Sequence, residues 1–304
     1  MKKHLPLLAV LAAFSMLVFG SAQAAAGARQ ALSLCAATLI PSLFPFFVLA
    51  NLLADMGLPE LLGRSLGGAA RRIFHVSGRG VQAFFLGISG GYPLGAATVA
   101  DLRQKKLISR QEAERLLPFC NNSGPAFILG AAGGVFGSVR AGLMLYATHV
   151  AAALAVGFLL RGPAPPPTDT PPAAPPSSFS RAFPAAVTRA VQSTLAVCGY
   201  VVLFSALLGL LAPLQRLAPL WLAMATGFLE LGSGIAALRG LPPTASNLAA
   251  AAFLLGWGGL SVHFQTLGVL AGTDIKSARH LAGRALCGIL AALFTFFLAL
   301  IFPQ

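Results

Sequence analysis

The chain has 304 residues, of which 57% are hydrophobic and 10% charged, and its mean hydropathy is +0.80. Because a soluble domain carries about 25% charged residues, this composition excludes an ordinary soluble protein and predicts a polytopic membrane protein. The formal net charge of +13 is therefore expected to orient loops and contact anionic headgroups of the lipid bilayer, and we expect no nucleic acid as a partner.

Residues 1–30 begin with Lys2 and Lys3, followed by an apolar stretch and the small-residue run Ala22-Gln-Ala24. This pattern is typical of a signal peptide, and it is equally typical of an uncleaved N-terminal transmembrane helix or signal anchor. In both cases the two lysines place the N-terminus in the cytoplasm.

The next apolar run, 31–54, contains Pro41 and Pro45, so we expect a helix that is kinked or restarts there. The segment 57–79 combines several arginines with leucines at helical spacing. This pattern predicts an amphipathic helix at the cytoplasmic membrane interface.

The run 82–100 is apolar but rich in glycine, with Tyr92-Pro93 near its middle. It predicts a re-entrant hairpin rather than a straight span. The charged segment 101–115 follows, where Ser109 and Glu112 have the spacing of a helix capping box.

The run 116–135 is interrupted by two amides and a hydroxyl, Asn121, Asn122 and Ser123, with a proline on either side. A spanning helix breaks only where protein or a water-filled cavity replaces the lost backbone partners. Broken helices at mid-depth are where transporters place their binding sites. We therefore expect a break here and a polar site beside it. An ordinary span follows at 138–160.

A proline-rich segment, 162–184, predicts an extended linker between a first repeat, 31–161, and a second repeat, 185–304. The apolar runs of the second part are 185–212, 220–238, 248–271 and 281–302. The middle two are interrupted by glycine, as in the first part, and paired interruptions favour a transporter core built from two similar halves. Chance likeness between glycine-rich segments is the alternative, and the relation of the halves, inverted or parallel, is left open.

Basic residues predict the orientation of the loops. The arginines of 57–79 and the later cluster of Lys276, Arg279 and Arg284 mark cytoplasmic segments. We expect the linker 162–184 on the opposite face of the membrane.

Glu230 is the one acid in the interior of an apolar run. An ionisable group at that depth is a functional hypothesis by default, with a structural hydrogen bond between helices as the alternative. The candidate site for a small polar solute or ion comprises Asn121, Asn122, Ser123, Glu230, His263, Gln265, Ser89 and Tyr92.

The run Gly87-Ile-Ser-Gly90 fits the nucleophile-elbow pattern and resembles the Gly-x-Ser-Gly of rhomboid proteases, with His149 as a candidate base. The upstream His-x-x-x-Asn pattern of those proteases is missing, as are Walker A, His-Glu-x-x-His and Cys-x-x-Cys motifs. We therefore expect no enzyme, cofactor or metal. The four dispersed cysteines are expected to be buried thiols without disulfides.

Five stretches in this order resemble the YlbJ family of sporulation integral membrane proteins. They are Pro41-Ser-Leu-Phe-Pro-Phe-Phe47, Gly87-Ile-Ser-Gly-Gly-Tyr-Pro-Leu-Gly-Ala96, Ala100-Asp-Leu-Arg103, Glu112-Ala-Glu-Arg-Leu-Leu117 and Phe119-Cys-Asn-Asn-Ser-Gly-Pro125. That family belongs to the wider group with the nucleoside recognition or Gate domain. The resemblance covers about residues 38–160 closely. It implies a multi-pass protein of the inner (cytoplasmic) membrane in endospore formers, with a transporter-like core and an uncleaved first helix.

The expected fold is an all-α polytopic membrane bundle with discontinuous or re-entrant helices. The leading functional hypothesis is a transporter, channel or gate for a small polar solute or ion in endospore formation. A membrane scaffold that recruits a sporulation partner through 57–79 and 101–115 is the alternative, followed by an intramembrane serine hydrolase at Ser89. A second copy of the chain is left open as a further partner.

Overall fold

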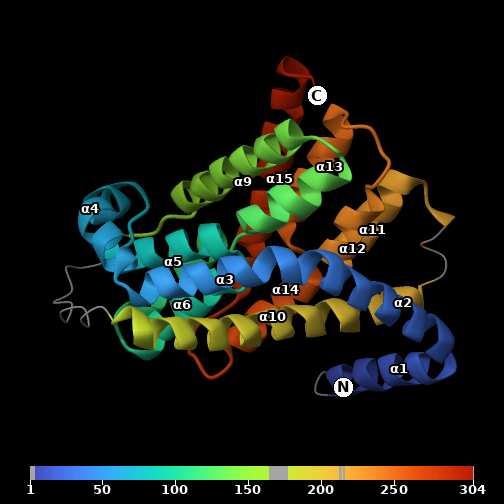
Figure 1. The fold of residues 1–304 in the computed structure, drawn as a ribbon, viewed down its shortest axis with the longest axis horizontal. Coiled ribbons are helices and arrows are strands. Elements are labelled where there is room, and N and C mark those ends of the chain that lie inside the picture. The colour runs from blue at the N-terminus through green and yellow to red at the C-terminus, as the bar shows by residue number, and fades with distance from the viewer. Residues whose placement is uncertain (1–3, 164–176, 212–213, 215, 304) are drawn as a thin grey trace.

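The computed structural model describes residues 4–163, 177–211, 214 and 216–303, and the described residues form helices without β-strands (Figure 1). The prolines of the predicted linker from Pro165 to Pro176, and Lys2 and Lys3, lie outside the described residues. Within the described part, five helices are long and apolar enough to cross a membrane. They are Ser21–Asp55, Val139–Leu159, Phe179–Gly209, Ala245–Leu270 and Ala278–Ile301. The expected all-α polytopic fold is therefore confirmed.

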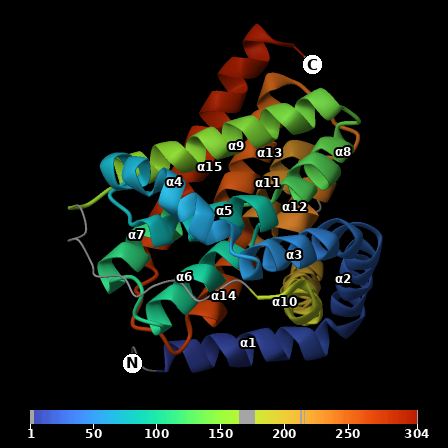
Figure 2. The same cartoon turned by 60° about the vertical axis from the view of Figure 1, so that its left-hand side comes forward.

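The first long span is one continuous but bent rod built from α2 (Ser21–Leu34), a π-helical segment η1 (Cys35–Leu39) and α3 (Ile40–Asp55). Pro41 has no N–H to donate into the preceding turn, and the wider π turn lies directly before it. The rod lies alongside α10 (Phe179–Gly209) (Figures 1 and 2). The shorter α1 (Leu5–Phe19) contacts mainly α2.

The two breaks predicted in the first part of the chain are confirmed. Helix α5 (Gly78–Gly90) ends before Gly91-Tyr-Pro93, and α6 (Leu94–Gln104) packs back against it as a hairpin. Helix α7 (Arg110–Cys120) ends at the Asn121–Pro125 run, and η2 (Ala126–Ala132) and α8 (Gly133–Val135) follow. Helix α9 (Val139–Leu159) then forms a long span.

The second part also places two interrupted helical segments between two long helices. Helix α10 is followed by α11 (Pro219–Leu229) and α12 (Leu231–Ala237), which are separated at Glu230. Helix α13 (Ala245–Trp257) and α14 (Gly259–Leu270) are separated at Gly258, and both Gly258 and Gly259 have positive φ, 91° and 79°. The long α15 (Ala278–Ile301) ends the bundle. A structural repeat that relates the halves stays a prediction.

Glycines allow the broken helices to approach one another closely. A Cβ added to Gly87 or Gly95 would lie 1.6 or 2.0 Å from the carbonyl oxygen of Cys120. Gly91, at φ +86°, would place a Cβ 2.6 Å from the backbone nitrogen of Gly124. The two breaks of the first part therefore touch backbone to backbone, as small residues permit in membrane bundles.

Several basic loops lie at one end of the molecule, and the described ends of the linker lie there too. Ser177 N donates to Asp55 O over 3.0 Å, and Gly162 O accepts from His75 Nδ1 over 2.5 Å. Both ends of the linker thus lie beside the flanks of α4 (Leu58–Ile73), the amphipathic helix. The expectation that 162–184 lies on the face opposite to 57–79 is therefore wrong.

The same end holds the other charged connections, and we call it the basic face. Arg103 donates from Nε and Nη2 to the two carboxylate oxygens of Asp274, 2.9 and 2.8 Å away, and this pairing holds the pKa of Asp274 below its usual value. Arg279 donates to Leu160 O, which fastens α15 to the end of α9. The prediction failed for the linker because basic residues mark cytoplasmic segments without fixing how many times the chain crosses the membrane between them.

Two other local expectations are changed by the structure. Ser109 caps α7 by accepting from Glu112 N over 3.1 Å, but Glu112 Oε1 accepts from Ser77 N over 2.6 Å instead of closing the capping box. Helix α10 begins at Phe179, so the last residues of the predicted linker are helical.

The close crossing of the breaks predicts which glycines the fold requires. We expect Gly87→Ala to lower stability by about 1–3 kcal/mol, because the new methyl group meets the Cys120 carbonyl oxygen. Gly199→Ala in α10 is the matched control, because nothing lies within 4 Å of its added Cβ and alanine favours the helix. Thermal unfolding of the purified variants measures both, and equal midpoints for the two would contradict the packing.

Because α4 and the described ends of the linker lie at the same end of the bundle, we expect both to be accessible from the same side of the membrane. In a cysteine-free background we expect Ser65→Cys on α4 and Ser178→Cys before α10 to react with an impermeant maleimide from the same side of the membrane. Arg140→Cys, at the start of α9 and therefore at the far end of that span, should react from the other side. Opposite sidedness for Ser65 and Ser178 would refute the basic face.

Candidate functional site

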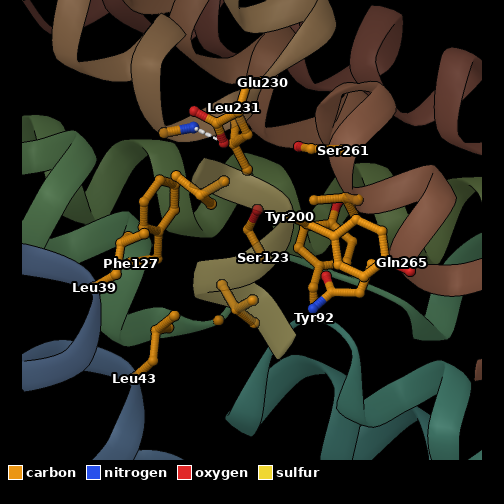
Figure 3. A pocket seen from close by; sticks show the side chains of 15 residues that line it. Leu39, Leu43, Tyr92, Ser123, Phe127, Tyr200, Glu230, Leu231, Ser261 and Gln265 are labelled. Atoms are coloured by element: carbon orange, nitrogen blue, oxygen red, sulfur yellow. Dashed lines mark hydrogen bonds between the residues drawn. The ribbon is translucent and has the colours of Figure 1, made fainter. Parts of the chain in front are cut away.

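A small cavity lies where the broken helices meet (Figure 3). Its open space, measured by where the centre of a water molecule can stand, is about 50 Å³. One water requires roughly 10–15 Å³ on this measure, so the cavity holds a few waters or a small ion. Its walls are mainly apolar, with the polar side chains of Tyr92, Ser123, Glu230, Ser261 and Gln265 among them.

The break between α13 and α14 supplies an acceptor beside this cavity. Because Gly258 and Gly259 leave the helical conformation, the carbonyl of Leu255 accepts side-chain donors instead of continuing the helix ladder. Tyr92 Oη lies 3.2 Å from this oxygen, Ser123 Oγ 3.3 Å and Arg284 Nη2 3.4 Å. One freed carbonyl of α13 therefore ties together the two breaks of the first part of the chain and helix α15 of the second part.

Arg284 is the central side chain of this network. It is fully buried in α15, donates from Nη1 to Asn122 Oδ1 over 3.0 Å and from Nη2 to Tyr92 Oη over 2.6 Å. Its Nε has no partner, and none of the ion pairs among the described residues includes it. All of its hydrogen-bond partners are neutral, so the guanidinium places an uncompensated positive charge next to the cavity.

The sequence interpretation missed Arg284 by grouping it with the basic loop of Lys276 and Arg279. The available signal was its position four residues after His280 and inside the apolar run 281–302. Residues at that spacing share one helix face. A basic residue inside an apolar run, rather than before it, indicates an interior position, and the structure shows that His280 on the same face is buried as well.

Glu230 lines the cavity, but both of its carboxylate oxygens accept hydrogen bonds from the backbone of the turn that follows it. Oε1 accepts from Gly232 N over 2.9 Å and Oε2 from Ser233 N over 2.5 Å, so Glu230 is the N-cap of α12. The carboxylate thereby satisfies two of the free amides at that helix start and faces its positive dipole end.

The two asparagines lie behind the cavity wall. Asn121 joins α6 to α14, because its Oδ1 accepts from Ala96 N over 3.3 Å and its Nδ2 donates to Thr266 Oγ1 over 2.9 Å. Asn122 donates to Phe119 O over 2.7 Å and holds Arg284. Both are fully buried cross-links, and Asn122 reaches the cavity only through the arginine.

Three further polar groups have unused hydrogen-bonding capacity. Ser261 Oγ and Gln265 Nε2 line the cavity, are 2% and 4% exposed as residues, and have no partner. Figure 3 shows Ser261, Gln265 and Tyr92 along the right-hand side of the cavity and Glu230 at its top. His263 lies outside the lining, with Nδ1 3.3 Å from His280 Nε2 and with Nε2 unpartnered.

The predicted hydrolase residues do not meet. Ser89 Oγ donates to Phe85 O one turn earlier over 2.7 Å, whereas His149 Nε2 accepts from the backbone N–H of Ser123 over 3.2 Å. Neither residue lines the cavity. No group of three or more metal-ligating side chains occurs among the described residues.

A larger cavity, about 720 Å³ by the same measure, lies next to the first. We call it the vestibule. It is lined by the N-terminal part of α2 and the C-terminal end of α10, which are the ends away from the basic face, together with α11 and α12. Ser205 and Ser233 line it and face each other with Oγ atoms 3.1 Å apart. The turn of Glu230 to Ser233 therefore separates the vestibule from the small cavity.

Comparisons with known proteins identify the family of this chain. Residues 36–161 match the family model Gate, described as "Nucleoside recognition". The chain is 32% identical to the sporulation integral membrane protein YlbJ of Bacillus subtilis over 310 aligned positions, covering 89% of this chain and 76% of that protein. No solved structure matches. The chain therefore belongs to the family of the sporulation integral membrane protein YlbJ and carries a Gate domain.

Proposed function

We propose that this protein is a transporter or gate of the cytoplasmic membrane for a small anion, acting in endospore formation. The observation that carries the proposal is Arg284, a fully buried guanidinium hydrogen-bonded only by neutral groups. Burying a charge without a counter-charge costs several kcal/mol, and proteins retain such groups where they serve a function. A solute with negative charge is the missing counter-charge.

The backbone around the cavity favours the same sign of charge. The first turns of η2, α12 and α14 contribute Phe127, Leu231 and Ser261 to its lining. Helix starts carry partial positive charge and attract anions. Glu230 already satisfies α12, which leaves η2 and α14, with the unpartnered Ser261 and Gln265, to face a solute.

The vestibule supports a gating mechanism. It lies toward the end of the bundle that is away from the basic face. The positive-inside rule assigns the basic face to the cytoplasm, so the vestibule lies toward the opposite side of the membrane. The turn from Glu230 to Ser233 is the barrier, and Leu34 packs against it, with Cδ2 3.1 Å from an added Cβ on Gly232. Movement of α12 away from α2 and α10 would join the vestibule to the small cavity.

We propose that two Gate-like repeats, 31–161 and 185–304, form this core, with 162–184 as the linker. The breaks of the first repeat contribute Tyr92 and Ser123 to the cavity, and those of the second contribute Glu230 and Ser261. Transporters commonly place solutes at such a repeat interface. A scaffold function would require only the basic face, so it leaves the buried arginine and the cavity unexplained.

The charge of the solute can be tested without knowing its identity. In lipid nanodiscs we expect acetate, phosphate or sulfate to raise the thermal midpoint, because a ligand that binds only the folded state stabilises it. Arg284→Met should abolish this increase, whereas Arg279→Met, an exposed arginine of the same helix, should keep it. Uridine and adenosine serve as neutral solutes, because the family model is described as nucleoside recognition.

Two outcomes would contradict the proposal. One is stabilisation by the nucleosides that survives Arg284→Met, with none by the anions. The other is equal stabilisation by anions in the native protein and in Arg284→Met, which would place them on the surface.

Glu230 offers a second test, which measures how much its carboxylate contributes to stability as the N-cap of α12. Gln at this position can accept through one oxygen only, so we expect Glu230→Gln to lose one cap bond and about 1 kcal/mol of stability. Glu230→Asp keeps a carboxylate of the type that caps helices, and we expect it to be the milder change. Unfolding midpoints compare the two, and an unchanged midpoint for Glu230→Gln would show that the cap is dispensable.

A further inference from the structure

Two histidines form a buried pair that the solute site does not use. His263 of α14 and His280 of α15 are 3% and 1% exposed, and His263 Nδ1 lies 3.3 Å from His280 Nε2. His280 Nδ1 lies 3.3 Å from the carbonyl oxygen of Leu117. The pair thus bridges α14, α15 and α7 beside the site.

These contacts fix where each proton sits when the pair is neutral. A carbonyl oxygen can only accept, so His280 Nδ1 carries a hydrogen and donates to Leu117 O. Its Nε2 is then an acceptor, and His263 Nδ1–H donates to it. His263 Nε2 is left with a lone pair, and this buried atom has no partner. The pair therefore has a vacant site for one proton.

Arg284 ties this vacant site to the solute cavity. It follows His280 by four residues on α15, so the two side chains lie on the same helix face, with Cβ atoms about 5–6 Å apart. Its positive charge opposes a second positive charge on the pair. An anion next to Arg284 would offset that opposition and allow the proton to bind.

The other titratable groups nearby lie around Arg284, and none of them is a carboxylate that would offset its positive charge. They are Tyr92 from the α5–α6 break, Cys120 from α7, His149 from α9 and Cys287 from α15 itself. Glu230, from the α11–α12 break, is held by its own cap. Among the described residues, α6, α10 and α13 bring no charged side chain to the pair.

We propose that His263 and His280 form a proton-binding site whose occupancy rises when an anion occupies the Arg284 site, so that proton and anion are bound together. The proposal rests on the proposed function for the anion, but the proton site stands on the pair alone. The proton comes from water, bonds to His263 Nε2, and returns to water when it leaves; no other bond is formed or broken.

Trp257 provides a direct readout. Its ring lies edge to face with His263 at a centroid distance of 4.3 Å, and a protonated imidazole beside an indole quenches its fluorescence. The chain has two tryptophans, so Trp221→Phe leaves Trp257 as the one emitter. The experiment titrates this full-length protein in nanodiscs with acid, with and without acetate or sulfate.

We expect quenching on acidification that is lost in His263→Asn and in His280→Asn but kept in His75→Asn, a histidine at the basic face. Arg284→Met should move the midpoint of quenching up by about one to two pH units, because it removes a nearby positive charge. Arg284→Lys, which keeps the charge, should leave the midpoint in place. The anions should raise the midpoint in the native protein and have no effect in Arg284→Met.

The outcomes separate the two proposals. Quenching that persists in both histidine variants, or a midpoint that is the same in Arg284→Met and Arg284→Lys, overturns the proton site. A midpoint that responds to Arg284→Met but not to either anion supports the proton site and counts against the anion as the solute.

Discussion

The polar centre of the bundle is one buried charge and the carbonyl that helps to hold it. Arg284 of α15 is bound by Asn122, Tyr92 and the Leu255 carbonyl, which belong to three different breaks in the helices. A guanidinium cannot lose its proton at physiological pH and presents five donors in a rigid plane. The breaks are therefore arranged around it, because each exposes a polar group that a continuous helix would have used internally.

The same constraint explains why glycine and small residues are concentrated at the core. The carbonyl of Cys120 is close enough to Gly87 and Gly95 to exclude a methyl group at either position. In lipid, apolar side chains gain little from packing on one another rather than on acyl chains, so close backbone contact and internal hydrogen bonds hold the helices together. These contacts also place the starts of η2, α12 and α14 against one cavity.

Much of the fold could be predicted from the sequence, because its strongest signals are local. Pro93, Pro125 and their neighbouring glycines fix the two breaks of the first part, and both were located correctly. The face on which the linker lies was predicted wrongly. That face depends on how often the chain crosses the membrane before the linker and on how α3 and α10 pack, and local sequence signals fix neither. Of the candidate site residues, Tyr92, Ser123, Glu230 and Gln265 line the small cavity, whereas Ser89, His263 and the two asparagines do not. Arg284 was missed because its partners lie far away in sequence.

The account holds that Arg284 is retained for solute binding rather than for the fold. The most direct measurement is the unfolding free energy of Arg284→Met without solute, compared with that of the native protein. Arg284→Met relieves the cost of burying an uncompensated charge but removes the donor to the buried Asn122 Oδ1, and we predict a value within about 1–2 kcal/mol of the native one. A loss of several kcal/mol, as expected when a group essential to packing is removed, would contradict the account and make the arginine a structural tie.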